Sequence, residues 1–234
     1  MSETTESGFD VKENYTRLED WFNRNSKLVY IVLGSLAGIV LLYVGYKKLY
    51  AEPRRNKAYA EMRFAENYFG KYISDASHRD SLNLALNGDR VHKGFLQIID
   101  KYGGTDAGNL AQAYAGIIYL YQGKFKDAAD HLEKFEGNDP FVAPEVIGDI
   151  GDAYAELNNF DKALEYYKKA AYQSDNDQTA PLYLKRAGML CEKLKKYDEA
   201  RKYYEEIKNK YPKTQDGSTI DKYLSRLDVL QHGS

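Results

Sequence analysis

The sequence predicts an all-α protein in which a single N-terminal transmembrane helix precedes an α-solenoid. Two observations predict this fold class: an uncharged apolar run at residues 28–46, and a pattern of small and aromatic residues that recurs at intervals of 35 and 37 residues. Repeat periods between about 20 and 50 residues are typical of stacked helical units. We expect a tail with a short amphipathic helix at 1–27, the transmembrane helix at 28–46, a linker helix and degenerate repeat or cap at 47–108, three repeats at 109–214, and a capping helix at 215–234.

Length, charge and cysteine content limit the classes of function. The chain has 234 residues and a formal net charge of −2, so no strong basic field favours nucleic acid as a partner. The single cysteine, Cys191, excludes an intrachain disulfide and leaves the redox compartment open. The 22 tyrosines suit packed helical repeats, in which the ring is buried and the hydroxyl reaches the edge.

The tail is expected to form an amphipathic helix. Asp10 is a candidate N-cap, and Glu13 completes a capping box three residues later. Trp21 and Phe22 lie just before the apolar run, where aromatic rings favour the membrane interface. This pattern favours a helix lying on the membrane; the alternative is a helix that docks a membrane partner through Leu18, Trp21 and Phe22. The apolar stripe consists of Val11, Tyr15, Leu18 and Phe22.

The apolar run reads LVYIVLGSLAGIVLLYVGY. A helix needs roughly 20 apolar residues to cross a hydrocarbon core of about 30 Å, and this run meets that length. It ends in Val44-Gly45-Tyr46-Lys47 rather than in a small-x-small cleavage site, so we interpret it as an uncleaved anchor. Gly34, Gly38 and Gly45 form a candidate surface for packing against another membrane helix, although such spacings are also common by chance.

Basic residues flank the run unequally. The positive-inside rule favours a cytoplasmic domain after the run, although long domains can be translocated regardless of nearby charge. Arg17, Arg24 and Lys27 precede the run closely, whereas Lys47, Lys48, Arg54, Arg55 and Lys57 follow it.

Three segments of the soluble part align with one another, and each places small and aromatic residues at the same offsets. The first has Gly116, Tyr119, Gly123, Phe125, Ala128, Leu132 and Pro140, the second Gly151, Tyr154, Asn158, Phe160, Ala163, Tyr167 and Asp175, and the third Gly188, Cys191, Lys195, Tyr197, Ala200, Tyr204 and Pro212.

This pattern resembles the tetratricopeptide repeat, a helix–turn–helix unit of about 34 residues. The small residues are expected to let the two helices of each pair approach closely, and the aromatic residue is expected to open the second helix. Gly123 and Asn158 suit the left-handed residue that ends the first helix, whereas Lys195 weakens the turn predicted in the third copy. The expected repeats are 109–142, 144–177 and 181–214.

Further helices are expected on both sides of the repeats. Pro53 is expected to open a helix at 54–74, and shorter helices are expected at 80–86 and 91–102. A final helix at 219–230 is expected to cover the apolar face of the last repeat. The inward residues are Ala58, Met62, Ala65, Tyr68, Phe69 and Tyr72 in the first of these helices, and Ile220, Tyr223, Leu224, Leu227 and Leu230 in the last.

Residues that carry chemistry are scattered along the sequence. No histidine forms a metal-type pair, and no serine or threonine follows Gly123-Lys124, as a phosphate loop would need. Cys191 falls on a core position of its repeat. We therefore expect no enzymatic activity, cofactor, metal or small-molecule substrate. The histidines are His78, His92, His131 and His232, and the carboxylates of Asp149, Asp152, Glu156 and Asp161 are interpreted as a solvated acidic face.

A solenoid of this kind presents a groove lined by the first helix of each pair. The expected lining is mixed apolar and charged, which suits a peptide or a partner's helix; the alternative is that these residues only hold the superhelix together. Ile117, Asp152 and Met189 occupy the positions at which related co-chaperones hold a terminal carboxylate, which argues against that function. The expected groove residues are Ala113, Ile117, Leu120, Tyr121, Asp152, Glu156, Lys185, Met189 and Glu192.

The whole layout resembles one family. The pre-span segment ENYTRLEDWFNRNSK, the span, and the repeats AGNLAQAYAGIIYLYQGKFKDAADHLEKF and VIGDIGDAYAELNNFDKALEYYKKAA are together similar to YfgM-like ancillary subunits of the bacterial SecYEG translocon, in the tetratricopeptide form seen in Bacteroidetes. The resemblance implies an inner-membrane protein with a cytoplasmic tail and a periplasmic repeat domain. It also implies association with the translocon and with periplasmic chaperones that handle exported chains. Alternatives are a scaffold of another envelope complex without clients, and a cytoplasm-facing adaptor.

Overall fold

The computed structural model describes the backbone of residues 11–232 and the side chains of residues 15–231. Within that range the chain forms helices and no strand, as the sequence predicts. The expected N-cap Asp10 and the first part of the tail lie outside the described residues, as do the side chains of Val11 and Glu13. The chain divides into two compact units between Arg54 and Arg55, and each unit is described by itself.

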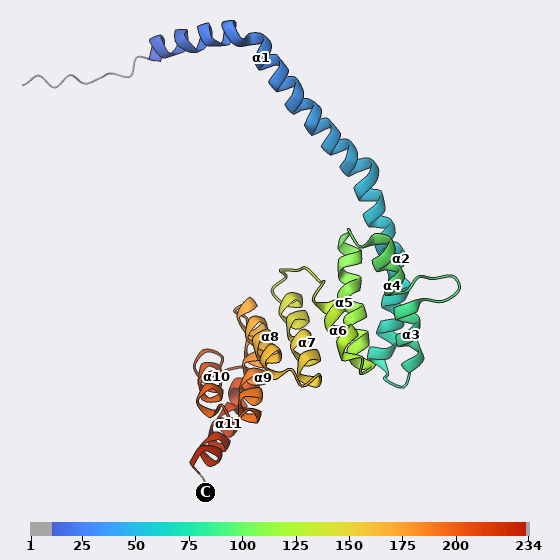
Figure 1. The fold of residues 1–234 in the computed structure, drawn as a ribbon, viewed down its shortest axis with the longest axis vertical. Helices are drawn as coiled ribbons and strands as arrows, with labels where there is room; N and C mark the ends of the chain where they lie inside the picture. Colours follow the sequence, from blue (N-terminus) through green and yellow to red (C-terminus); the bar gives the residue numbers. More distant parts are fainter. Residues whose placement is uncertain (1–10, 233–234) are drawn as a thin grey trace, which may run out of the picture. The chain divides into compact units, whose positions relative to one another are not determined.

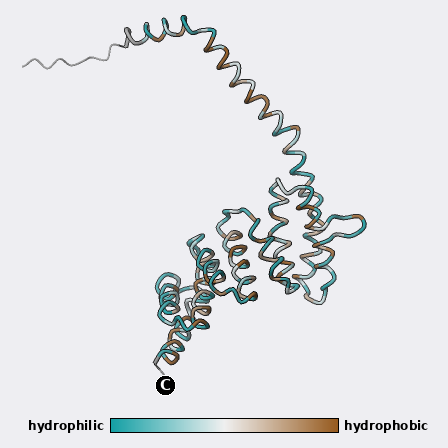
Figure 2. Tube along the Cα trace, viewed as in Figure 1, coloured by the Kyte–Doolittle hydropathy of each residue, from teal (hydrophilic) through white to brown (hydrophobic). Residues whose placement is uncertain are grey.

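The first unit holds α1 (Val11–Tyr46), the π-helical turn η1 (Lys47–Ala51) and the first three residues of α2 (Glu52–Ser74). The tail and the apolar run therefore lie on one helix, because residues 11–27 contain no proline or glycine to end a helix between them. Figure 2 shows hydrophobic residues along the second part of α1, and none of the most apolar window is buried. Within the described part of the chain, this is the one helix whose length and composition would allow it to cross a membrane.

The second unit begins with three helices that pack against the first repeat. They are α2 (Glu52–Ser74), α3 (Arg79–Asn87) and α4 (Phe95–Tyr102). The predicted inward face of α2 is confirmed, since Met62 is fully buried and shares a core with Phe95 and Ile98. The helix predicted from residue 91 begins only at Phe95, because the carboxylate of Asp89 accepts hydrogen bonds from the next backbone N–H groups and holds this segment as a loop.

The three predicted repeats are present as three helix pairs, whose helices lie side by side in Figure 1. The small residues have the predicted role: a Cβ atom on Gly116 would lie 2.4 Å from Leu132, and one on Gly188 would lie 2.3 Å from Tyr204. The pairs are α5 (Asp106–Tyr121) with α6 (Phe125–Leu132), α7 (Val142–Glu156) with α8 (Phe160–Gln173), and α9 (Ala180–Lys193) with α10 (Tyr197–Lys210).

All three pairs use the same turn. Gly123, Asn158 and Lys195 have φ angles of 71°, 59° and 58°, which lie in the left-handed region. The third pair forms the turn as well, although Lys195 stands where the first pair has glycine, and the backbone hydrogen bonds that close the turn also form there. The Lys196 N–H donates to the Cys191 carbonyl at 2.8 Å, as the Lys124 N–H does to the Tyr119 carbonyl at 2.9 Å in the first pair.

The second helix of the first pair is unusually short. Helix α6 has 8 residues, whereas α8 and α10 each have 14. The chain leaves α6 after Leu132, and the side-chain amide of Asn109 on α5 forms two hydrogen bonds with the backbone of Glu136. These bonds satisfy the backbone groups that a longer helix would pair internally.

The last helix, α11 (Gln215–His232), packs against α9 and α10. Ile220 and Leu227 are fully buried there, as predicted, but Leu230, which was also predicted to face inward, is exposed. Cys191 is fully buried in the same core, as its repeat position predicts.

Candidate functional site

A cavity of about 550 Å³ lies at the first helices of the repeats. We call it the α5–α7 cavity, because most of its lining residues come from those two helices. One wall is apolar and aromatic, and the other carries carboxylates. Its lining consists of Ile117, Leu120, Tyr121, Phe125, Asp149, Asp152, Ala155, Glu156, Tyr167 and Arg186.

The acidic wall follows from spacing on one helix. Asp149, Asp152 and Glu156 are three and then four residues apart on α7, which places them on one face. Asp152 is fully engaged: one carboxylate oxygen accepts a hydrogen bond from the Tyr167 hydroxyl at 2.7 Å, and the other accepts one from the guanidinium of Arg186. A tyrosine of α8 and an arginine of α9 therefore fix the middle of this wall.

Asp149 has a different environment. Within the described residues, its carboxylate has no hydrogen-bond or ion-pair partner, although it is partly buried. Burial, followed by the nearby charge of Asp152, raises the pKa of Asp149 to about 7, and Arg186 only partly offsets this rise. The interpretation of these carboxylates as a solvated face is wrong for Asp149 and Asp152. It fits Asp161, whose side chain is 94% exposed.

The cavity brings together part of the expected groove. Ile117, Leu120, Tyr121, Asp152 and Glu156 all line it.

The other expected groove residues lie elsewhere. Ala113 is buried in the core between α5, α6 and α7, so its small side chain lines no groove. Lys185 pairs with Asp216 of α11, and Glu192 accepts hydrogen bonds from Tyr204 and Arg226, so these two charges are used to seat the last helices. Met189 is exposed outside the cavity.

Arg186 also lines this site, although it is not among the residues predicted from the sequence. A short sequence motif could have identified this arginine. The guanidinium of Arg186 lies 5.4 Å from the ring centroid of Tyr183, which stands three residues earlier on α9. The same motif occurs on α11, where Arg226 lies 4.8 Å from the ring centroid of Tyr223. The sequences YLKR and YLSR therefore mark two similar stacking positions on α9 and α11.

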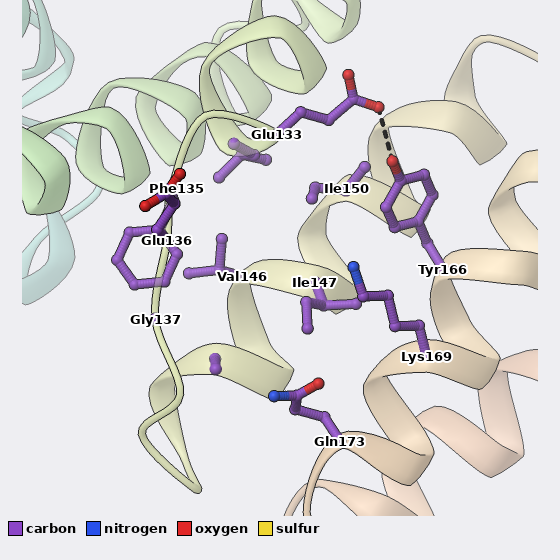
Figure 3. A pocket seen from close by; sticks show the side chains of 12 residues that line it. Glu133, Phe135, Glu136, Gly137, Val146, Ile147, Ile150, Tyr166, Lys169 and Gln173 are labelled. Carbon is purple, nitrogen blue, oxygen red and sulfur yellow. Dashed lines mark hydrogen bonds between the residues drawn. The ribbon is translucent and has the colours of Figure 1, made fainter.

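A second cavity, of about 600 Å³, lies beside the segment that follows the short helix α6. Figure 3 shows Val146 and Ile147 of α7 in its apolar lining, and Lys169 of α8 on the opposite side. Glu133 accepts a hydrogen bond from Tyr166 at 2.8 Å, so its carboxylate already has a partner. Phe135, Glu136 and Gly137, which follow the end of α6, also line this cavity.

No group of three or more histidine, cysteine or acidic side chains that could hold a metal occurs among the described residues. His131 is bound by Gln112 at 2.7 Å and stacks on Tyr119, whereas His92 pairs with Asp89 at 2.9 Å. Both histidines thus have structural partners in the fold.

The expected membrane-proximal residues lie in the first unit. Leu18, Trp21 and Phe22 are all exposed on α1. Added Cβ atoms on Gly34 and Gly38 would meet nothing within 4 Å, and the same holds for Gly45. These positions therefore have the space that close packing of another helix requires.

Comparison with protein families supports the assignment of the repeats. Residues 114–181 and 149–213 match the family described as tetratricopeptide repeat. A comparison with curated proteins found no match. The family match covers all of the second and third pairs and most of the first, so these repeats are of the tetratricopeptide type, a fold that typically serves as a protein-interaction module.

The chain is also similar to solved structures. A Podosopora anserina protein of nearly identical TPR-like repeats, assigned as a kinesin light chain, aligns with a TM-score of 0.53 and 12% identity over 74% of this chain and 85% of its own. BtubC from P. vanneervenii aligns with a TM-score of 0.42 and 14% identity over 76% and 67%, respectively. PilF from Pseudomonas aeruginosa aligns with a TM-score of 0.43 and 16% identity over 78% and 95%. At 12% identity, the similarity to the Podosopora anserina protein shows the fold alone.

Proposed function

We propose that this tetratricopeptide repeat protein is a membrane-anchored, non-enzymatic module that binds polypeptides beside the Sec translocon. One observation carries the proposal: the same chain has an apolar helix in whose most hydrophobic window no residue is buried, and a repeat domain with an open cavity. An exposed apolar segment of that length is stable in a hydrocarbon core. The repeat domain is then held at a membrane surface, where it meets chains that cross or leave the membrane.

The translocon is proposed as the partner because the tail, span and repeats resemble those of YfgM-like subunits. In this proposal the repeat domain is periplasmic, and its partners are SecYEG, periplasmic chaperones or newly exported chains. Leu18, Trp21 and Phe22 dock the tail to the channel or its partners, and Gly34, Gly38 and Gly45 pack the span against another membrane helix. The exposure of these three side chains and the open space at the glycines support such contacts.

A second candidate is an adaptor whose repeat domain faces the cytoplasm. The five basic residues at positions 47–57 favour it, because positive charge near a span is retained on the cytoplasmic side. A scaffold of another envelope complex without client binding is a third candidate, because exposed helical faces alone are sufficient for assembly.

Protease protection separates the two orientations. Full-length protein is probed in spheroplasts and in inverted inner-membrane vesicles, and fragments of the repeat domain are followed with an antibody. The proposal expects digestion in spheroplasts and protection in inverted vesicles. The opposite pattern would place the repeat domain in the cytoplasm and overturn the periplasmic role.

Co-purification tests the partner. Membranes are cross-linked and solubilised gently, and the full-length chain is isolated together with its neighbours. We expect translocon subunits in this fraction, and we expect fewer of them when Leu18, Trp21 and Phe22 are changed together to alanine. The neighbouring polar changes Glu19→Gln and Asp20→Asn serve as the matched control. Absence of translocon subunits under conditions that preserve the intact channel would exclude this partner.

A further inference from the structure

We infer that the α5–α7 cavity binds a polypeptide segment in which a basic side chain lies next to an apolar one. The inference rests on the proposed polypeptide-binding function and adds the chemistry of the bound segment. It follows from the two unlike walls of the cavity and from the partners that its charged groups have, or lack, within the repeat domain.

The apolar wall is a fixed aromatic platform. Tyr121 is 52% exposed, yet its ring is held by an edge contact with Tyr72 of α2 at 5.1 Å and by a tilted contact with Phe69 at 6.5 Å between ring centroids. Ile117 and Leu120 continue this wall along α5. A ring positioned in this way offers its face to an aliphatic side chain or to the stem and charge of a lysine or arginine.

The acidic wall has more carboxylates than cations. Arg186 is the one cation in the cavity lining, and it donates to Asp152, so its charge is already matched. Neither Asp149 nor Glu156 has a hydrogen-bond or ion-pair partner within the described residues. The cavity therefore complements a positive charge, because a cation placed between these two carboxylates would give them the charge–charge interaction that they lack.

The second cavity, beside α6, has a smaller excess of negative charge. Its lining holds Glu133, Glu136 and Lys169, and Glu133 already accepts hydrogen bonds from the hydroxyls of Tyr154 and Tyr166, both at 2.8 Å. Charge complementarity thus selects the α5–α7 cavity as the site for a basic segment.

Binding is expected to depend on pH through Asp149. The ionisable groups that act on its carboxyl are Asp152 and Glu145 of α7 and Arg186 of α9, while Tyr183 of α9 and Tyr121 of α5 lie close enough to feel its charge. Because the pKa of Asp149 is about 7 in the empty cavity, a basic ligand must bind with release of a proton below that pH. Affinity for the basic segment should therefore rise between pH 6 and pH 8.

The test compares three labelled peptides, SGSLKLSGS, SGSLELSGS and SGSSKSSGS, by fluorescence anisotropy on the full-length protein in nanodiscs at low salt. We expect the first peptide to bind about tenfold more tightly than either of the others at pH 8, since it alone has both the charge and the apolar neighbours. The double variant Asp149→Asn/Glu156→Gln is expected to bring the ratio of the lysine to the glutamate peptide close to one.

The matched control is Asp161→Asn/Glu205→Gln, which removes the same charge from two exposed carboxylates outside the cavity. It is expected to leave that ratio unchanged. Equal binding of the lysine and glutamate peptides to the unmodified protein would overturn the inference, while the polypeptide-binding function would stand. Equal loss in both double variants would show a general charge effect and would also overturn it.

Failure of all three peptides to bind would likewise overturn the inference. The proposed location beside the translocon is tested separately, by protease protection and co-purification, so the two failures can be told apart. Tyr121→Ala provides a second variant with no change of charge. It is expected to weaken SGSLKLSGS far more than SGSSKSSGS, because it removes the exposed ring of the apolar wall, and an equal effect on both peptides would contradict that assignment.

Discussion

The guanidinium of Arg186 donates a hydrogen bond to the carboxylate of Asp152 and so links the first helices of the second and third repeats. The same carboxylate accepts a hydrogen bond from Tyr167 on the intervening helix α8. One acidic side chain therefore joins three consecutive helices. This arrangement fixes the end of the α5–α7 cavity and leaves Asp149 and Glu156 as its unmatched charges.

A similar arrangement closes the end of the repeat domain. Glu192 accepts hydrogen bonds from Tyr204 at 2.6 Å and from Arg226 at 2.8 Å. Here too, a tyrosine of a second helix and an arginine of the next helix share one carboxylate. The acidic residue stands at a different register from Asp152, so the contact is equivalent in geometry although the sequence position is not.

Removal of either partner of the Arg186–Asp152 pair should destabilise the repeat domain. Arg186→Ala is expected to lower the free energy of unfolding by about 1–2 kcal/mol, because it leaves neighbouring carboxylates without a cation. A double-mutant cycle with Asp152→Ala should give a coupling energy of about 1 kcal/mol in urea unfolding. The exposed Lys196–Asp161 pair, at 3.9 Å, is the control and should give a coupling near zero. An equal coupling energy in both pairs would contradict a specific stabilising role of the Arg186–Asp152 pair.

Gly148 should tolerate no side chain. A Cβ atom at this position of α7 would lie 1.9 Å from the ring of Tyr183, so Gly148→Ala forces the second and third repeats apart. We expect a loss of about 1–3 kcal/mol in the free energy of unfolding. Gly70 of α2 has open space at its Cβ position, and Gly70→Ala should instead stabilise by about 0.5–1 kcal/mol. Chemical unfolding followed by circular dichroism measures both, and a stable Gly148→Ala variant would refute the close approach.

The stability of the repeat domain should depend on the ionisation of Asp149. Its folded pKa of about 7 lies above the ordinary value of 3.8, so the group stabilises the fold while protonated, and this contribution is lost as the pH rises through 7. Asp149→Asn stays neutral and should gain about 1–3 kcal/mol over the unmodified protein between about pH 5 and pH 8. Urea unfolding at several pH values measures this difference. Asp161→Asn should show no such trend, and a pH-independent difference for Asp149→Asn would exclude the raised pKa.

The three turns allow a test of left-handed backbone geometry. Lys195 has φ +58°, which costs free energy for a residue with a Cβ atom, so Lys195→Gly should stabilise the domain by about 0.5–1 kcal/mol. Gly123 has φ +71° and open space around its Cβ position, so Gly123→Ala should destabilise by about 1 kcal/mol through conformation alone. Thermal unfolding of both variants is the measurement. Changes of the same sign would show that something other than the backbone angle dominates.

The helix pairs could be predicted from the sequence because each small residue has a bulky partner at a fixed offset. Gly116 meets Leu132, and Gly188 meets Tyr204, so spacing alone identifies the close contacts between helices. The turn at Lys195 was harder to predict, because the backbone hydrogen bonds of the helix end impose the left-handed angle on whichever residue stands there.

The short α6 and the acidic wall could not be predicted in the same way, because both depend on contacts between distant residues. Asn109 binds the backbone of Glu136, 27 residues later, and nothing in the local sequence marks that bond. Asp152 obtains its cation from Arg186, 34 residues away. From the sequence alone, a carboxylate on an amphipathic helix is interpreted as solvated, because the sequence does not show which neighbouring repeat covers it.

The packing of α11 against the last helix pair determines how such a domain can gain further repeats. This helix repeats the Tyr-x-x-Arg motif of α9 and buries Ile220 and Leu227 against the last pair, so it occupies the place that the first helix of a further pair would take. Because each pair contacts mainly its neighbours, a duplicated copy inserted before α11 would meet surfaces like those already present at both of its ends. Tandem duplication within the gene can therefore lengthen the array one unit at a time without exposing a new apolar terminus.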